Sequence, residues 1–234
     1  MNHSRIIVSL FAVGAIFFAS CASTPVANDS EQTTKMSLVE YAASGKYSRP
    51  MEWKAGQYVE EENLTKGKRD SINRTLIVGK EKGGWIIESS STDKKGKKSI
   101  SQVLFLGMDE AVKNGNTSGV SIGWMKMIDD DGNIQVLEGE QLMFYNMFSK
   151  ETLESLVTDI TTFTDGGSVS VPAGNFSGTN KVLASIKILG MKIETESWYH
   201  PAVPVNGMVK SRSTDGKTES RLISFGFDGK PELK

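Results

Sequence analysis

Hydrophobic residues alternate with polar ones through most of the chain from Trp53 onward, in short runs separated by turn-forming residues. The first four runs cover residues 57–64, 71–80, 85–90 and 99–106. In the second run Ile72, Leu76 and Val78 fall on one face, as in a strand with one buried and one wetted face. Runs at this spacing, with Gly- and Lys-rich turns between them, predict an antiparallel meander rather than alternating strands and helices.

The alternation continues in the second half of the chain. Residues 120–128 place Val120, Ile122 and Trp124 on one face and then reach a turn at residues 129–133. Further strands are predicted at residues 169–171, 181–188, 191–198, 208–212 and 220–227.

Two segments have helical spacing instead. Apolar side chains share a helical face over residues 37–43, and five of them follow a period of 3.6 over residues 150–163. The expected fold is therefore mainly β: a single curved antiparallel sheet or half-barrel with one or two packed helices.

The first twenty residues differ from the rest. A short segment with one positive charge, residues 1–5, is followed by an apolar run at residues 6–18. A membrane-spanning helix needs about 20 apolar residues, so this run is too short to span a bilayer and is typical of a signal peptide.

The signal ends in Phe18-Ala19-Ser20-Cys21, which resembles the lipobox of bacterial lipoproteins, although Phe18 stands where leucine is usual. The resemblance implies that Cys21 carries diacylglycerol, that cleavage occurs just before it, and that the new amine receives a fatty acid such as palmitate. Several acyl chains give stable membrane anchoring. The alternative is a conventional signal cleaved nearby, which would leave a soluble secreted protein.

The expected organisation is a signal peptide at residues 1–20, a lipidated flexible tether at residues 21–35 and a β-rich globular domain at residues 36–234. The tether is rich in Ser, Thr, Asn and Pro, the composition of a flexible linker. Ala22 after the cysteine suggests the outer membrane, by analogy with enteric bacteria. Cys21 is the single cysteine of the chain, so an internal disulfide is excluded.

Charge is nearly balanced, with 27 basic and 28 acidic residues. Nucleic-acid binding proteins carry a basic excess, so this composition argues against a nucleic-acid partner. The balance also indicates that the lipid on Cys21, not the protein surface, contacts the membrane. A local exception is the turn with Lys94, Lys95, Lys97 and Lys98, which is either a solvated hairpin or a contact for an anion or partner.

Two motifs of the C-terminal half, Val169-Ser170-Val171-Pro172-Ala173-Gly174-Asn175-Phe176 and Trp198-Tyr199-His200-Pro201-Ala202-Val203-Pro204 with Gly207-Met208-Val209-Lys210, are similar to those of a group of uncharacterised bacterial envelope lipoproteins. The arrangement more distantly resembles the half-barrels of lipoprotein carriers, in which a curved sheet holds an acyl chain. The resemblance implies a fold and a compartment, and it implies no catalytic residue.

Catalytic and metal-binding motifs are weak. Ser121 lies in a G-x-S-x-G pattern with Asp159, Asp165 and His200 downstream, which is the chain order of an α/β-hydrolase, but the surrounding pattern predicts a strand rather than a nucleophile elbow. Residues 127–138 partly fit a calcium-binding loop, although Met127 occupies the first ligand position. One histidine outside the signal and one cysteine cannot build a tetrahedral metal site. No cofactor is expected.

Methionine and aromatic side chains concentrate in one region, which suits an adaptable apolar surface or ordinary core packing. The candidate ligand-binding residues are Trp124, Met125, Met127, Met143, Phe144 and Met147. The sequence therefore favours a non-enzymatic, lipid-anchored envelope protein with a structural or surface-interaction role. The alternative is a carrier of a lipid or other apolar ligand in a concave sheet, and a serine hydrolase is the weakest option.

Overall fold

The computed structural model describes residues 52–109, 119–128, 132–143, 145–146, 159–188 and 191–234. The signal peptide, Cys21, the tether and the helix predicted at residues 37–43 lie outside these ranges. The described chain forms eleven strands. They are β1 (Tyr58–Thr65), β2 (Lys68–Glu81), β3 (Gly84–Asp93), β4 (Lys98–Leu106), β5 (Ser121–Ile128), β6 (Ile134–Glu138), β7 (Asp159–Val171), β8 (Gly174–Ile188), β9 (Met191–Tyr199), β10 (Met208–Ser213) and β11 (Thr218–Gly226).

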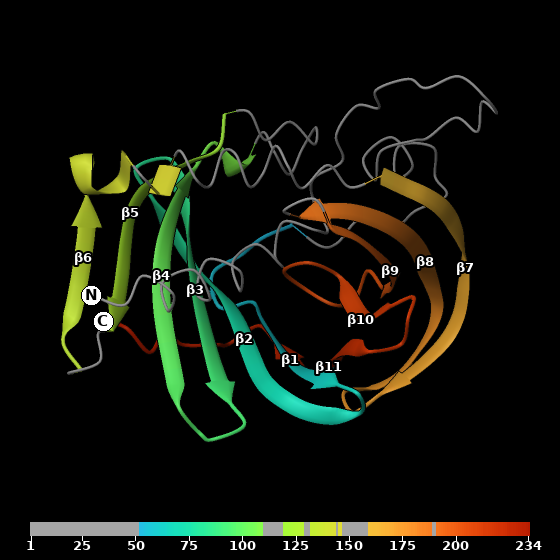
Figure 1. The fold of residues 1–234 in the computed structure, drawn as a ribbon. Coiled ribbons are helices and arrows are strands. Elements are labelled where there is room, and N and C mark those ends of the chain that lie inside the picture. Colours follow the sequence, from blue (N-terminus) through green and yellow to red (C-terminus); the bar gives the residue numbers. More distant parts are fainter. Residues whose placement is uncertain (1–51, 110–118, 129–131, 144, 147–158, 189–190) are drawn as a thin grey trace.

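All eleven strands belong to one antiparallel sheet, in the order β6-β5-β4-β3-β2-β1-β11-β10-β9-β8-β7. Every neighbouring pair except β1 and β11 is a hairpin or a sequential connection, so the meander predicted from the alternation is confirmed. The pairing of β1 with β11 joins the two halves of the chain. The sheet is open, with β6 and β7 as its edges (Figure 1).

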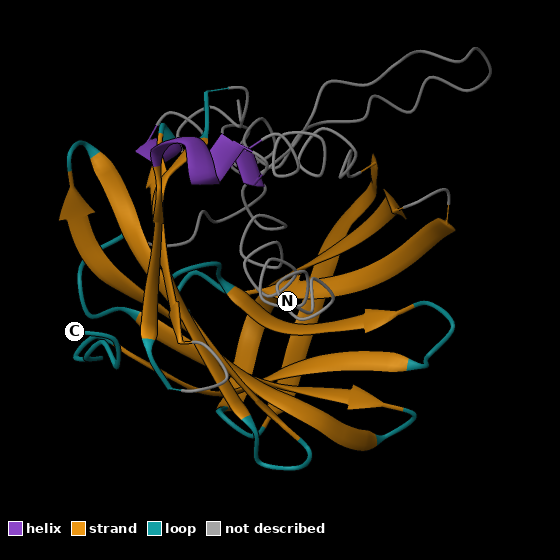
Figure 2. Cartoon of the chain, turned by 60° about the vertical axis from the view of Figure 1, so that its left-hand side comes forward, coloured by secondary structure: helices purple, strands orange, loops and turns teal. Residues whose placement is uncertain are grey.

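The predicted helices are not supported. Residues 159–163, expected as the end of a helix, belong to strand β7, and the rest of the predicted helix lies outside the described residues. This stretch carries two threonines, Thr161 and Thr162, and Thr164 follows it; their β-branched side chains fit a strand better than a helix. The helical residues that the structure describes are a short 3-10 helix, η1 (Gly139–Leu142), and a few residues beside it and after β4 (Figure 2).

Side chains alternate between two faces of the sheet. The inner face carries the hydrophobic core, in which Ile77, Ile87 and Val103 lie opposite one another on β2, β3 and β4. The same cluster includes Val171 and Val209 from the other half of the chain. One core therefore joins both halves of the sheet.

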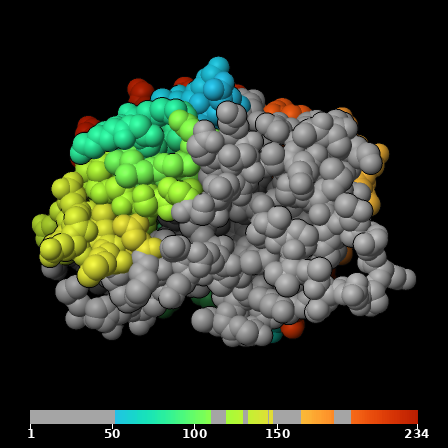
Figure 3. Space-filling model, turned by 90° about the horizontal axis from the view of Figure 1, so that it is seen from above, coloured from blue at the N-terminus to red at the C-terminus, as the bar shows by residue number. Residues whose placement is uncertain are grey.

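Trp53 connects the halves beyond the strand pairing. The Trp53 indole donates to the carbonyl of Val205 at 2.7 Å and packs edge-on against Trp85, with ring centroids 5.7 Å apart. Within the second half, the Ala173 amide donates to the carbonyl of Leu222 at 3.1 Å, which ties the β7–β8 turn to β11. Seen from above, strands β1–β5 lie along one side of the molecule and the orange residues of the later strands lie on the other (Figure 3).

The outer face of β2–β4 is covered by the end of the chain, which runs across these strands in Figure 1. Glu88, which is only 1% exposed, accepts hydrogen bonds from the backbone amides of Glu232 and Leu233 and from the Gln102 side chain. Gln102 in turn donates to the Leu233 carbonyl at 2.7 Å. A buried carboxylate is tolerated only when it is hydrogen-bonded, and two of the donors to Glu88 are backbone amides of the C-terminal segment. Glu88 thus holds that segment on the sheet.

Candidate binding face

A row of small polar side chains crosses the inner face of five neighbouring strands. It consists of Ser197, Ser211, Ser220, Asn63 and Ser71, which lie opposite one another on β9, β10, β11, β1 and β2. Ser197 Oγ donates to Ser211 Oγ at 2.9 Å, and Asn63 Nδ2 donates to Ser71 Oγ at 3.1 Å. We call this set the hydroxyl row.

A second polar row lies beside it on the other half of the sheet. Glu61, Asn73, Ser91 and Ser99 are opposite one another on β1–β4, and Ser91 Oγ donates to Asn73 Oδ1 at 2.7 Å. The inner face therefore changes from apolar to polar toward the end of the sheet that carries the β1–β2 and β3–β4 turns.

Between the second polar row and the apolar core lies Ser89. Its neighbours across the sheet are Thr75 and Ser101, and all three are buried. Ser89 Oγ has no hydrogen-bond partner within the described part of the chain, although the residue is only 6% exposed. A buried hydroxyl without a hydrogen-bond partner costs about 1–3 kcal/mol.

A pocket of about 290 Å³ opens along the hydroxyl row. The side chains on the inner face that line it are all hydroxyls or amides, namely Asn63, Thr65, Thr195, Ser211, Ser213, Thr218 and Ser220. Leu64, Arg212 and Glu219 complete the lining from intervening strand positions. We call this the first pocket.

A second pocket of about 410 Å³ lies between the β1–β2 and β3–β4 turns. Its lining comprises Arg69, Asp70, Ser71, Ile72, Thr92, Asp93, Lys94 and Gly96. Two hydrogen bonds join the linings of the two pockets: Asn63 Nδ2 to Ser71 Oγ, and Thr65 Oγ1 to Asp70 Oδ2 at 2.6 Å. The two pockets are therefore neighbours.

Glu61 lies at the β1 end of the second polar row, two residues before Asn63 of the hydroxyl row. Burial raises its pKa from 4.5 to about 7, and a hydrogen bond from Asn206 opposes this shift. Burial also raises the pKa of Tyr199 to about 12; a hydrogen bond with Ser197 opposes that shift, and the charge of Glu61 adds to it. These groups link β1 and β9 with the segment that follows β9.

That segment contains the one β-branched residue with a left-handed backbone among the described residues, Val205, with φ of 67°. Val205 is 2% exposed and its carbonyl accepts the bond from Trp53. A left-handed conformation at a β-branched residue costs free energy and is retained where the surroundings enforce it. The next residue, Asn206, is held by its side-chain Oδ1, which accepts the Met208 amide at 3.0 Å.

The raised pKa of Glu61 predicts a pH-dependent stability. The folded chain binds a proton at Glu61 more tightly than the unfolded chain does, so stability is full below pH 4.5 and falls as the pH rises to about 7. Because Glu61 is half-buried, we expect a loss of about 2 kcal/mol rather than the full value of the shift. Urea denaturation at pH 5 and pH 8 measures it.

The Glu61→Gln variant is expected to remove most of this difference, because glutamine stays neutral at both pH values. Glu138→Gln, at the exposed end of β6, is the matched control and should keep the wild-type profile. An unchanged difference in Glu61→Gln would show that other groups cause the pH dependence.

The predicted apolar cluster is divided by the sheet. Met125 is buried in the core and Met127 packs against it, whereas Trp124 is buried on the opposite face, where its indole donates to Glu81 at 3.2 Å. Met143 is 72% exposed. Phe144 and Met147 lie outside the described residues. The four described members of the cluster do not line a common site.

The candidate hydrolase residues Ser121, Asp165 and His200 do not come together in the described part of the chain. Ser121 begins strand β5 and continues into it, so the strand-turn-helix of a nucleophile elbow is absent there. His200 follows β9, which six strands separate from β5 in the sheet order, and its Nδ1 accepts the Ala202 amide at 3.2 Å. Asp165 accepts the Gly167 amide within β7.

The calcium-loop candidate lies partly outside the described residues, at Asp129–Asp131, and its last position, Glu138, ends strand β6. Among the residues described, no group of three or more His, Cys, Asp or Glu is placed to hold a metal ion. The helices of the described chain include none that is long and apolar enough to span a membrane.

The polar rows were not singled out from the sequence. Their signal is present as serine, threonine and asparagine at alternate positions of strands, such as Ser211 and Ser213 or Ser89 and Ser91. Such residues are common on solvated faces, and only the strand order shows that they share the face of the core.

No family model matches the chain, and no curated protein matches it. Among solved structures it is similar to a Bacteroides fragilis protein with a YmcC-like fold that is thought to be exported, at 14% identity and TM-score 0.34, over 74% of this chain and 96% of the other. It is also similar to the hypothetical protein CT021 of Chlamydia trachomatis, at 10% identity and TM-score 0.45, over 85% and 96%. At these values neither likeness carries a functional argument.

Proposed function

We propose that this chain is a lipid-anchored protein of the bacterial envelope that binds a hydroxyl-rich polymer, a saccharide, on the inner face of its sheet, without catalysing a reaction on it. The observation that carries this proposal is the first pocket, where seven hydroxyl or amide side chains from four strands converge. The proposal makes the surface-interaction role expected from the sequence more specific.

The chemistry of the lining supports a saccharide. Serine and threonine hydroxyls both donate and accept hydrogen bonds, and the asparagine amide does the same through separate atoms, so the pocket can match the mixed donors and acceptors of a sugar. The volume, about 290 Å³, is at the small end of ligand pockets and suits one or two sugar units.

The proposal includes the curved form of the sheet that the sequence predicts, because a polymer would lie along a concave inner face. Support comes from the core cluster, in which Ile87 and Val103 of one half pack together with Val171 and Phe176 of the other. It also includes the lipid on Cys21 and the outer-membrane location, which rest on the signal and the residues around the cysteine.

The acyl-chain carrier has less support. An apolar ligand needs an apolar lining, and the residues predicted to supply it lie on opposite faces, with Trp124 on the outer and Met125 on the inner face. The pocket on the inner face is instead polar.

Ser220→Ala is expected to weaken saccharide binding about 3- to 10-fold, because one hydrogen bond of about 0.5–1.5 kcal/mol is lost. Ser224→Ala is the matched control, since Ser224 is also half-buried on β11 but points to Glu60 on the outer face. Titration calorimetry with maltohexaose, chitohexaose and hexagalacturonate measures both variants.

The proposal predicts that at least one of the three hexasaccharides binds the wild-type protein and that only Ser220→Ala weakens it. Failure of all three to bind, or equal effects of the two substitutions, would contradict a saccharide site in the first pocket.

A further inference from the structure

Basic residues collect at one end of the sheet, on the β1–β2, β3–β4 and β10–β11 turns and their flanks. All eight are exposed: Lys66, Lys68, Arg69, Lys94, Lys95, Lys97, Lys98 and Lys217. Four acidic residues lie on the same turns or form an ion pair or hydrogen bond with one of these basic residues: Asp70, Asp93, Asp215 and Glu232. This region, which we call the basic end, therefore carries a net charge of +4 in a chain whose total is −1.

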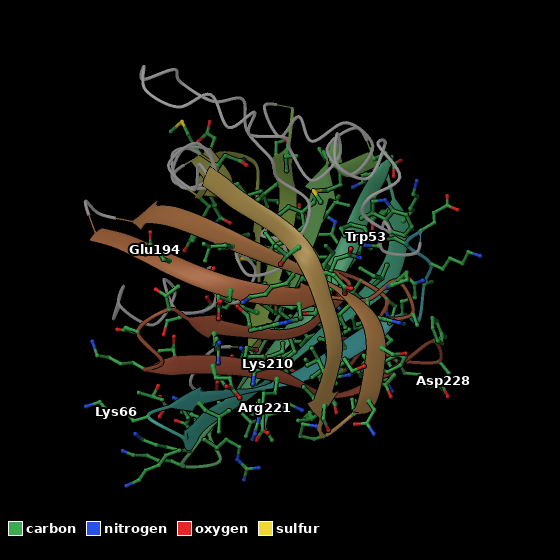
Figure 4. The ribbon with its side chains drawn as sticks, turned by 90° about the vertical axis from the view of Figure 1, so that its right-hand side faces the viewer. Trp53, Lys66, Glu194, Lys210, Arg221 and Asp228 are labelled. Atoms are coloured by element: carbon green, nitrogen blue, oxygen red, sulfur yellow. The ribbon has the colours of Figure 1, made fainter. Side chains whose placement is uncertain are left out.

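The three turns are held together by direct contacts. The Lys66 amide donates to the Lys217 carbonyl at 2.7 Å, which joins the β1–β2 and β10–β11 turns. Lys94 Nζ lies 3.6 Å from Asp70 Oδ1, which joins the β3–β4 turn to β2. Figure 4 shows Lys66 and its neighbouring side-chain nitrogens at this end, far from Trp53.

The acidic groups of the basic end have structural partners. Asp93 Oδ1 accepts the amides of Lys95 and Lys97, and these bonds lower the pKa of Asp93. Asp215 accepts Ser213 Oγ and the Lys217 amide, and the pKa of Asp215 is likewise lowered, chiefly by Lys217. These carboxylates stay ionised to shape the turns, and the exposed ammonium groups around them determine the sign of the local field.

The second pocket lies within the basic end, and its lining holds two cations, Arg69 and Lys94, and two carboxylates, Asp70 and Asp93. Both carboxylates are engaged locally, Asp70 by Thr65 and Lys94 and Asp93 by backbone amides of its own turn. It adjoins the first pocket through the Asn63–Ser71 and Thr65–Asp70 hydrogen bonds. A polymer that occupies the first pocket can therefore extend into the second without leaving the protein surface.

We propose that the second pocket binds the anionic substituent of the polymer, so that the ligand is an acidic glycan, bearing carboxylate or phosphate groups, rather than a neutral one. This inference rests on the proposed saccharide function. A glycan fits better than a membrane surface, because the cations adjoin two pockets that a chain can enter and a plane of headgroups cannot. The first pocket is lined mainly by hydroxyls, and the second holds the hydroxyls of Ser71 and Thr92 among charged side chains.

The test uses the purified full chain in neutral detergent, titrated with hexagalacturonate, maltohexaose and inorganic pyrophosphate. We expect hexagalacturonate to bind about tenfold more tightly than maltohexaose in 50 mM salt, with the difference shrinking in 300 mM salt because salt screens exposed charges. Measurable competition by pyrophosphate would identify phosphate as an accepted anion, and its absence would restrict the site to carboxylate.

Lys66→Gln/Lys94→Gln/Lys95→Gln is expected to abolish the preference for hexagalacturonate and leave maltohexaose binding unchanged. The matched control, Lys54→Gln/Lys82→Gln/Lys234→Gln, removes three exposed lysines outside the basic end and should keep the preference.

Equal binding of the acidic and neutral hexasaccharides by the wild-type chain would overturn this inference and leave the proposed function standing. Binding of neither would overturn both. The Cys21→Ser chain is also mixed with vesicles of 70% phosphatidylcholine and 30% phosphatidylglycerol. Sedimentation with these vesicles, combined with no binding of hexagalacturonate, would assign the basic end to a membrane and overturn the inference.

Discussion

Replacing Cys21 with serine is expected to move the protein from the membrane fraction to the soluble fraction. Serine has no thiol to receive diacylglycerol, so the acyl chains and their burial, about 0.8 kcal/mol for each methylene group, are lost. Because the charge of the chain as a whole is nearly balanced, its net charge would not hold the protein on an anionic membrane. Cell fractionation and the intact mass of the purified protein measure the result.

A matched control moves the thiol instead of deleting it. Cys21→Ser/Ser30→Cys keeps one cysteine within the tether but separates it from Ala19 and Ser20, so it should be as soluble as Cys21→Ser. If the wild-type protein has an unmodified Cys21, or if the shifted cysteine restores anchoring, then the lipobox interpretation is wrong.

Local strand structure could be predicted well because alternation is a property of neighbouring residues. The run at residues 57–64 became β1 (Tyr58–Thr65), and the run at 99–106 became the greater part of β4. The helical period at residues 150–163 failed for residues 159–163, since its threonines favour a strand and the pairing with β8 decides the outcome.

The candidate site was harder to predict, because it depends on contacts between distant parts of the chain. Ser220 and Asn63 share the first pocket only because β1 pairs with β11, and no pattern within either strand indicates that pairing. The methionine and tryptophan cluster is chemically distinctive, yet the same alternation that predicts β5 sends Trp124 and Met125 to opposite faces.

The net charge of the chain likewise does not predict the basic end. A chain with a total of −1 gives no reason to expect an anion-binding surface. The pairing of β1 with β11 places the β1–β2 turn beside the β10–β11 turn, so Lys66 and Lys217 meet although they are far apart in the sequence. This contact concentrates charge at one end of the sheet.

Glu88→Ala is expected to lower the free energy of unfolding by about 3–5 kcal/mol. The substitution leaves the amides of Glu232 and Leu233 and the Gln102 side chain without their acceptor, and each buried donor left unsatisfied costs about 1–3 kcal/mol. Urea denaturation measures the loss. Glu60→Ala, on the same face of the sheet but on β1, beyond β2, and partly exposed, should cost about 1 kcal/mol or less.

The source of this loss can be separated by truncation. If Glu88 acts by holding the C-terminal segment, then in a chain that ends at Phe227 the same substitution should cost only about 1 kcal/mol, because two of its three donors are gone. The truncation itself should destabilise the protein, since Leu233 is buried with the segment. If Glu88→Ala still lowers the free energy of unfolding by about 3–5 kcal/mol in the truncated chain, then the carboxylate stabilises the sheet through Gln102 and Arg74 instead. Arg74 Nη1 lies 3.7 Å from Glu88 Oε1.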